Sequence, residues 1–309
     1  MRKMRGYTFI STVIILALIS VISYFIFLDT DSMLSTYAKE QDQIQGSYYA
    51  ESIINIVLSK ENSEKLNDSL KKICFNKERE IPFNINFPIE DFNYTIDLLK
   101  NTKYKDGFSI KVNGNYRGIK SCAIASGNMI NRYYKEKSGV LNTYTIDNIE
   151  DFNNLKEMYS KLDEYFKDFS NVIILDNNDY YLENDGGYLS VYKIENEEKL
   201  ECHRIYKEKY VYISQKEGNL IIADNTNLKG VINVSNLILM GDIALEGMLN
   251  LNNTVVSENN SIYINGILAN FTSSGENHIF IDSKFSIIKS FGKYLPDFIK
   301  PTIYSLKKL

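Results

Sequence analysis

The residue types that most often do chemistry are few and widely spaced in this sequence. The 309 residues include two histidines, His203 and His278, and neither has a companion at a spacing typical of a metal site or a catalytic base. Cys74, Cys122 and Cys202 form no C-x-x-C pair, so a zinc site is not indicated. At most one internal disulfide can form, and its pairing stays open. We expect the thiols to be small buried apolar groups.

Acidic residues in the carboxy-terminal third are not arranged as a polysaccharide lyase would require. Asp224, Asp242, Glu246 and Glu258 are scattered, and no arginine follows Arg204. A lyase needs clustered acidic metal ligands beside a basic residue. The net charge of −4 gives no overall attraction to nucleic acid. We therefore expect no enzymatic activity, no metal or other cofactor and no direct nucleic-acid partner.

The amino terminus carries a basic leader followed by a long uncharged run. Arg2, Lys3 and Arg5 precede the run, and no residue from Tyr7 to Leu28 is charged. As a helix at about 1.5 Å per residue the run spans about 33 Å, which suits a bilayer core of about 30 Å. A cleaved secretory signal has a shorter apolar region of about 7 to 15 residues. The basic residues predict a single-pass helix with its amino terminus in the cytoplasm and the remaining chain outside.

Gly6 stands at the junction between the leader and the uncharged run. The phrase MRKMRG followed by YTFISTVIIL resembles the class III signal of the type IV pilin family. The resemblance implies that a membrane-embedded prepilin peptidase cuts between Gly6 and Tyr7 and methylates the new amino terminus. An uncleaved single-pass anchor, in which Gly6 has no role, is the alternative.

One position departs from the family pattern. Most members have a glutamate that pairs with the terminal amine of a neighbouring subunit, and this sequence has Ser11 in its place. A carboxylate in a bilayer costs about 2.5 to 3.5 kcal/mol, so it is retained where a partner offsets that cost. A serine can bond a carbonyl one turn back in its own helix instead. Ser11 is therefore expected to mark assembly register or a tip position.

The apolar run continues without proline into a longer helical pattern. Apolar residues recur near helical spacing among polar ones, which predicts one packed and one solvated face. These residues are Leu34, Tyr37, Ile44, Tyr48 and Leu58. We predict one helix from about Tyr7 to Lys60, weakest at Gly46.

Residues 48–52 read YYAES. This phrase resembles the YYAAES segment of PilX-type minor pilins of Gram-positive and other bacteria, where the spine helix leaves the membrane. The bias toward Asn, Ile and Lys fits a low-GC bacterium. An amphipathic helix with surface tyrosines is the plain alternative.

The middle of the chain alternates strand and helix patterns. Segments FNYTIDLL and FSIKVNGNYRGIKSCAIASG predict antiparallel strands around a turn at Asn113 and Gly114. Residues 147–169 predict one helix in which Asp147 and Glu150 form a capping box. Its apolar seam comprises Phe152, Leu155, Tyr159, Leu162, Phe166 and Phe169. Further strands follow, with a hairpin at the Gly-Gly pair 186–187.

The carboxy-terminal third alternates short apolar strands with Asn, Asp and Gly. Gly218, Gly230 and Gly241 punctuate it at nearly regular intervals. This repetition predicts a small β-solenoid or a stacked β-sheet. It also resembles the endings of some Gram-positive pilin-like proteins and, more loosely, the β-helices of bactofilins, which polymerise in the cytoplasm.

The predicted fold class is α+β, with a long amino-terminal helix, a mixed α/β middle containing antiparallel strands and a β-rich, solenoid-like carboxy-terminal part. The predicted segments are a leader at 1–6, a transmembrane and spine helix at 7–60, a mixed globular domain at 61–215, a repeat-like domain at 216–285 and a tail at 286–309. The tail contains Pro296 and Pro301, and it is expected to close a sheet or to lie on a membrane surface.

The resemblance implies a minor pilin or pseudopilin in a type IV pilus or related secretion filament. Its partners would be the prepilin peptidase, other pilin subunits and the assembly platform, and it would lie in the cell membrane and then in a surface filament. The alternative is a membrane-anchored, adhesin-like protein whose tyrosines and asparagines bind a surface glycan. A cytoplasmic scaffold would require the reverse topology.

Overall fold

The chain folds into two compact units. The computed structural model describes residues 3–76, 78–101, 106–195, 198–257, 259–272 and 278–308, with the backbone alone for residues 3–8. Unit 1 comprises Met1–Asn128 and Ile303–Leu309, and unit 2 comprises Met129–Thr302. This division differs from the boundaries expected at residues 60, 215 and 285, because the carboxy-terminal strand returns to the first unit.

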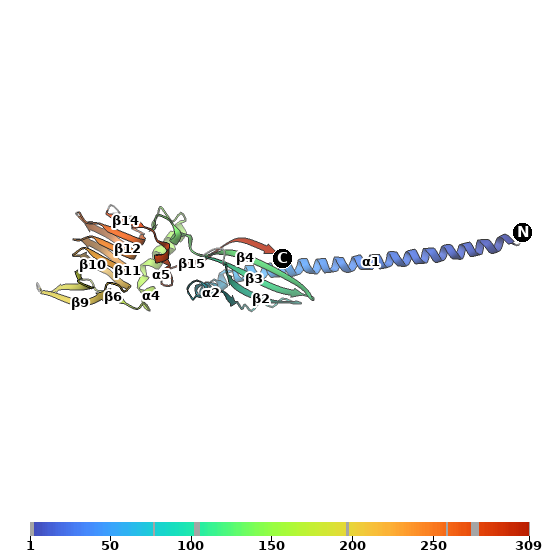
Figure 1. Cartoon of the computed structure of the whole chain (residues 1–309), viewed down its shortest axis with the longest axis horizontal. Coiled ribbons are helices and arrows are strands. Elements are labelled where there is room, and N and C mark those ends of the chain that lie inside the picture. The colour runs from blue at the N-terminus through green and yellow to red at the C-terminus, as the bar shows by residue number, and fades with distance from the viewer. Residues whose placement is uncertain are drawn as a thin grey trace. The chain divides into compact units, whose positions relative to one another are not determined.

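Unit 1 combines one very long helix with a five-stranded sheet (Figure 1). Its elements are α1 (Lys3–Val57), η1 (Lys60–Asn62), α2 (Ser63–Phe75), β1 (Glu80–Pro82), β2 (Phe92–Lys100), β3 (Gly107–Tyr116), β4 (Ile119–Ile130) and β15 (Ile299–Lys308). The strand order is β1-β2-β3-β4-β15. The pairs β1–β2, β2–β3 and β3–β4 are antiparallel.

Helix α1 is continuous over 55 residues, about 80 Å at the usual rise. Its carboxy-terminal half buries a stripe at helical spacing, formed by Gly46, Ala50, Ile53, Ile54 and Val57. Contrary to our expectation, the helix is not loosened at Gly46. A Cβ there would lie 3.1 Å from Ser121 Oγ and 3.2 Å from Tyr116 Cβ, so the glycine lets the helix approach the sheet closely.

The sheet of unit 1 presents an apolar face to α1. Cross-strand neighbours on that face include Leu98, Ile110 and Ala125, all fully buried. The predicted hairpin exists, but its turn is at Arg117 and Gly118, which both have positive φ and follow the pair Tyr116–Ile119. The prediction of a turn at Asn113 and Gly114 was wrong. Gly114 lies inside β3, where a Cβ would meet the Phe92 ring at 2.2 Å.

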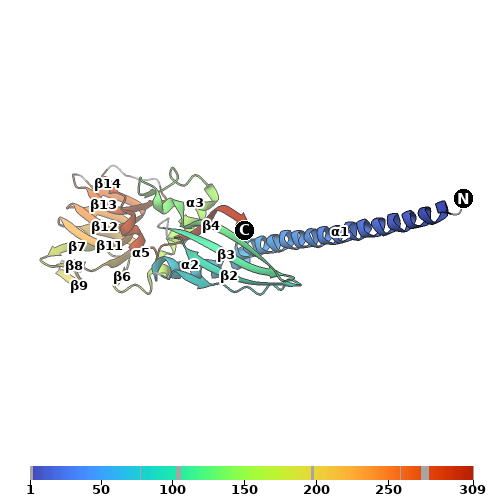
Figure 2. The same cartoon turned by 45° about the vertical axis from the view of Figure 1, so that its right-hand side comes forward.

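Unit 2 contains a ten-stranded sheet and a layer of short helices (Figure 2). Its helices are η2 (Arg132–Lys135), α3 (Ile149–Ser160), α4 (Leu162–Phe166) and α5 (Phe285–Phe291). Its strands are β5 (Val140–Leu141), β6 (Val172–Leu175), β7 (Tyr180–Asp185), β8 (Tyr188–Glu195), β9 (Glu198–Tyr206), β10 (Val211–Ile222), β11 (Thr226–Leu239), β12 (Ile243–Ser257), β13 (Ile262–Asn270) and β14 (Ile279–Asp282). The predicted hairpin at Gly186 and Gly187 joins β7 to β8.

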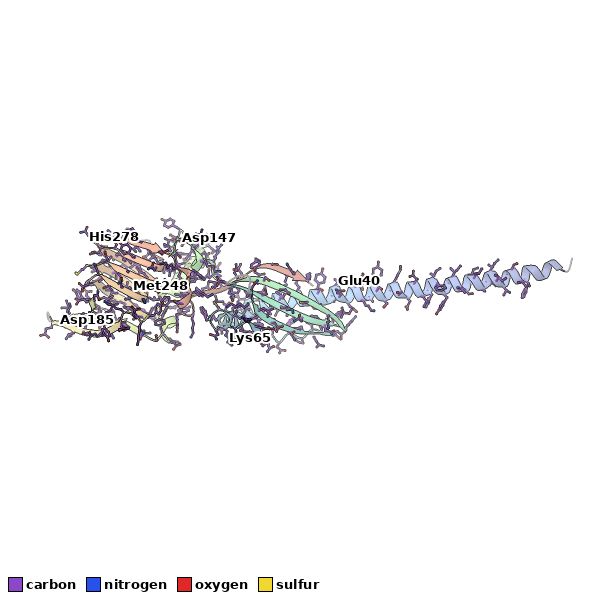
Figure 3. The ribbon with its side chains drawn as sticks, viewed as in Figure 1. Glu40, Lys65, Asp147, Asp185, Met248 and His278 are labelled. Carbon is purple, nitrogen blue, oxygen red and sulfur yellow. The ribbon has the colours of Figure 1, made fainter. Side chains whose placement is uncertain are left out.

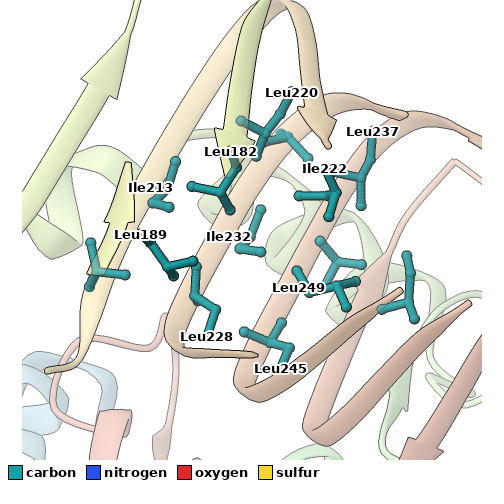
Figure 4. Close-up of a cluster of buried hydrophobic side chains, with 14 of the residues drawn as sticks. Leu182, Leu189, Ile213, Leu220, Ile222, Leu228, Ile232, Leu237, Leu245 and Leu249 are labelled. Carbon is teal, nitrogen blue, oxygen red and sulfur yellow. The ribbon is translucent and has the colours of Figure 1, made fainter. Parts of the chain in front are cut away.

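Strands β10 to β14 pair in parallel, each with the next, as the successive rungs of a β-solenoid do. Their inward side chains form one continuous apolar core, part of which Figure 4 shows with Leu228 and Leu245 from successive rungs. Gly230, Gly247 and Gly266 pair across the rungs, so the repeat is longer than the spacing read from Gly218, Gly230 and Gly241 suggested. Of Gly218, Gly230 and Gly241, only Gly230 belongs to this column of paired glycines.

The outer face of β10–β13 packs against aromatic side chains from the helix layer. The Phe166 ring of α4 stacks on Tyr212 of β10 at 4.4 Å. The predicted long helix is interrupted at Lys161, which separates α3 from α4. The capping prediction was also wrong, because Asn148 caps α3 by accepting from the backbone N–H groups of Glu150 and Asp151.

Unit 2 is inserted between two neighbouring strands of unit 1. β4 and β15 are adjacent in the five-stranded sheet, and the whole of unit 2 lies between them in sequence. Within unit 2, the outgoing and returning segments meet where Asn131 N donates to Phe298 O at 3.0 Å. The predicted fold class is confirmed, with the tail acting as a closing strand.

Candidate membrane and assembly segment

The amino-terminal half of α1 exposes its apolar side chains on all sides. Figure 3 shows side chains projecting from this half of the helix, with no other element of unit 1 beside them. They include Phe9, Ile14, Leu18, Ile22 and Phe25, each more than half exposed. Burial of apolar surface is worth about 25 cal/mol per Å², so such a surface requires lipid or protein around it.

This half of α1 satisfies its own polar groups. Ser20 Oγ donates to Leu16 O at 2.9 Å, and Thr30 Oγ1 donates to Ile26 O at 2.8 Å. Such bonds let hydroxyl side chains lie in an apolar medium at little cost. In the part of the chain that the structure describes, α1 is the single helix that is long and apolar enough to cross a membrane.

The predicted processing residues all lie at the start of the chain. Lys3, Arg5, Gly6 and Tyr7 belong to the helical backbone of α1, although their side chains are outside the described part, and Arg2 is outside the described residues. Ser11 lies on the same helix and is half-buried. Its proposed bond to the preceding turn, and cleavage after Gly6, stay predictions.

The YYAES segment lies where α1 packs on the sheet of unit 1. Tyr49 contacts the rings of Phe92 and Tyr116 at centroid distances of 5.5 and 5.3 Å, and Ala50 is fully buried. The aromatic and small residues of this segment therefore dock the helix onto its own sheet.

Lys308 of β15 connects the returning strand to the same helix. Its Nζ pairs with Glu51 Oε2 at 2.5 Å and lies 4.1 Å from the centre of the Tyr48 ring. A hollow of about 490 Å³ beside this contact is lined by Glu40, Gln43, Ile44, Ser47, Tyr48 and Lys308. Sequence reasoning missed this arrangement, since nothing local links residue 308 to residue 51.

A polar network holds the start and end of unit 2 together. Asp151 Oδ1 accepts from Lys300 Nζ at 2.7 Å, and its Oδ2 accepts from Tyr133 Oη at 2.9 Å. The hydrogen bond from Lys300 is the main cause of the lowered pKa of Asp151. Burial raises the pKa of Asp297, which nevertheless accepts from Asn131 Nδ2 at 3.2 Å. This arrangement is a structural clamp between segments distant in sequence.

The residues considered for chemistry are not brought together. Cys74 is buried, Cys122 is half-buried and Cys202 is exposed, and no disulfide joins any two of them. The described residues contain no group of three or more His, Cys, Asp or Glu side chains placed to share a metal ion. Asp224, Asp242 and Glu246 remain separate positions on the solenoid.

Comparisons with known proteins do not assign this chain to a family. No family model matches the chain, and no curated protein matches it significantly. Among solved structures, the chain is similar to the competence-associated pilin ComZ from Thermus thermophilus, with 9% identity and a TM-score of 0.29. The alignment covers 87% of this chain and 98% of that one. A TM-score of this size does not establish a shared fold.

Proposed function

We propose that this chain is a non-catalytic, pilin-like filament subunit, specifically a minor pilin or pseudopilin at or near a filament tip. The observation that carries the proposal is the division of α1 into two halves. One half is apolar and bare, and the other is docked on an antiparallel sheet. Such a helix suits a subunit that is first inserted in the membrane and then packs the same apolar side chains against the helices of neighbouring subunits.

Three features of the sequence and the structure support the finer parts of this proposal. The leader with Gly6 before Tyr7 is suited to a prepilin peptidase, and Ser11 in place of glutamate suits a minor or tip subunit. The YYAES segment, which docks α1 on the sheet, favours a PilX-type subunit from a low-GC, Gram-positive bacterium. The amino terminus would lie in the cytoplasm before extraction by an assembly platform.

The test is the mass of the mature protein in cells that contain a prepilin peptidase. The wild-type chain should lack Met1–Gly6 and carry a methylated Tyr7 amine. Gly6→Val should retain the leader, because a side chain obstructs the cleavage site, and should not enter the filament fraction. Ser20→Val, a similar change deeper in the helix, serves as the control and should be processed normally.

Retention of the leader in the wild-type chain under these conditions would refute processing. A processed chain that never co-purifies with other pilin subunits would refute assembly.

The second candidate function is a membrane-anchored surface-binding protein. The insertion of unit 2 between β4 and β15 favours it, since a separate module in a sheet connection is suited to display rather than to assembly. The two functions are compatible if the filament subunit carries a binding module at the tip. Normal filaments after deletion of this gene, together with lost surface binding, would favour the second function alone.

A further inference from the structure

The outward face of β11–β14 carries an exposed aromatic pair. Asn227, Ala244, Tyr263 and Phe280 occupy the same register position on four successive parallel strands. Tyr263 is 48% exposed and Phe280 is 54% exposed. Their rings stack at a centroid distance of 5.3 Å with an interplanar angle of 16°. Two large rings held in parallel on a part of the outer face that the helix layer leaves exposed form a rigid platform.

The register leaves space on one side of this platform. Neighbouring strands lie about 4.8 Å apart, so Asn227 and Tyr263 are separated by about 10 Å with Ala244 between them. Among the described residues, Phe280 is the only ring that Tyr263 contacts. Since Ala244 contributes a single methyl group, the Tyr263 ring is left uncovered toward β12. A six-membered sugar ring fits over one strand spacing.

The polar groups around this space suit a neutral ligand with hydroxyl groups. Asn227 is exposed, and no hydrogen bond of its side-chain amide occurs within the described part of the chain. Glu246 lies two residues along β12 from Ala244, and its Oε1 accepts from Tyr210 Oη at 3.3 Å. An amide and a carboxylate beside an aromatic ring provide the hydrogen bonds that orient a sugar.

Two lysines of this face, Lys229 on β11 and Lys284 just after β14, are already paired. Lys229 Nζ lies 2.7 Å from Glu208 Oε2, and Lys284 Nζ lies 3.1 Å from Asp282 Oδ2. An acidic ligand would therefore meet carboxylates beside lysines that already have partners, which disfavours it. This charge pattern selects an uncharged glycan over an acidic polymer.

We propose that the outward face of β11–β14 binds a neutral glycan, with one pyranose ring stacked on Tyr263 above Ala244. Asn227 and Glu246 bond the hydroxyl groups of that ring, and Phe280 holds the Tyr263 ring in place. The site depends on the proposed function only in requiring that unit 2 lie outside the cytoplasm.

The test is isothermal titration of the full-length chain in detergent micelles. The probes are maltohexaose, the hexasaccharide of N-acetylglucosamine and, as the acidic probe, polygalacturonate. At least one neutral hexasaccharide should bind, and polygalacturonate should bind at least tenfold more weakly. Tyr263→Ser should weaken binding of the neutral probe at least tenfold by removing the ring.

Ala244→Ile provides a second variant that removes no recognition group. Isoleucine suits a strand, so the sheet should be retained, but its side chain fills the space beside the Tyr263 ring and should weaken binding at least tenfold. Tyr206→Ser is the matched control, because Tyr206 is 47% exposed on β9 of the same unit. It should bind as the wild type does.

The proposed site would be overturned if neither neutral probe bound or if polygalacturonate bound more tightly than they do. It would also be overturned if Tyr206→Ser and Tyr263→Ser lost the same amount of affinity for the neutral probe. The same samples should still be processed after Gly6 if the proposed function holds. Failure of glycan binding with normal processing therefore rejects the site alone, while failure of processing rejects the proposed function alone.

Discussion

Three glycines of unit 2 hold backbone positions that residues with a side chain rarely adopt. Gly230, Gly247 and Gly266 have φ between +144° and +155°. A Cβ at Gly247 would lie 1.8 Å from the carbonyl oxygen of Gly230 on the preceding rung. The rungs therefore approach each other at these positions because a side chain is missing. The sequence shows the glycines, but only the strand register shows which of them stack.

We expect Gly247→Ala to destabilise the solenoid of unit 2 by more than about 2 kcal/mol, since it adds backbone strain and a clash with backbone atoms. Hydrogen–deuterium exchange should become faster in peptides that cover β11, β12 and β13. Gly187→Ala is the control, because the nearest atom to a Cβ there is Tyr206 Cε2 at 3.9 Å. Equal protection from hydrogen–deuterium exchange in the two variants would contradict the role given to the stacked glycines Gly230, Gly247 and Gly266.

Among the elements, α1 shows both the strength and the limit of sequence patterns. The uncharged run and the helical spacing of apolar residues predicted a long helix, and α1 extends from Lys3 to Val57. The prediction that the helix is weakest at Gly46 was wrong, because it rested on the low helix propensity of glycine alone. The contact with Ser121 that explains it joins residues far apart in sequence. For the same reason, the docking of the YYAES segment was not foreseen.

We expect Gly46→Leu to push α1 away from the sheet of unit 1, at a cost of about 1–3 kcal/mol. Amide exchange should accelerate in β3 and β4, where the helix packs, and should not change in β11–β13. Gln45→Leu places the same side chain at the preceding position, which is exposed, and should leave amide protection in β3 and β4 unchanged. Normal protection of β3 and β4 in Gly46→Leu would show that the close approach is not needed.

At the scale of the whole molecule, the sequence of unit 2 is inserted within the sequence of unit 1, so the two units do not follow one another along the chain. The sequence predicted the helix, the mixed middle and the repeated β-strands in the right order. It placed residues 61–215 in one domain because local patterns do not reveal which strands pair. The pairing of β15 with β4 assigns the carboxy-terminal strand to unit 1 and makes unit 2 an insertion. Of the candidate site, the membrane segment was readable from composition, while the glycan-binding face required the register of four strands.

We expect each unit to fold without the other. In one variant, residues 132–297 are replaced by Asn-Gly, since Asn131 and Phe298 are joined by a backbone hydrogen bond. This variant should keep protease-resistant β-structure in micelles and retain the helical anchor. A second chain of residues 129–302 should be soluble and should melt cooperatively. Aggregation of both chains would show that the units depend on each other for stability.

The return of β15 to the first sheet also determines the order in which the protein is completed during translation. The ribosome makes α1 and four strands, then the whole inserted module, and only afterwards the strand that covers β4. Until then β4 presents an open edge, which is a template for mispairing between nascent chains. A folding helper that shields this edge, or rapid folding of the module that brings the two junctions together, would raise the yield of correctly closed protein.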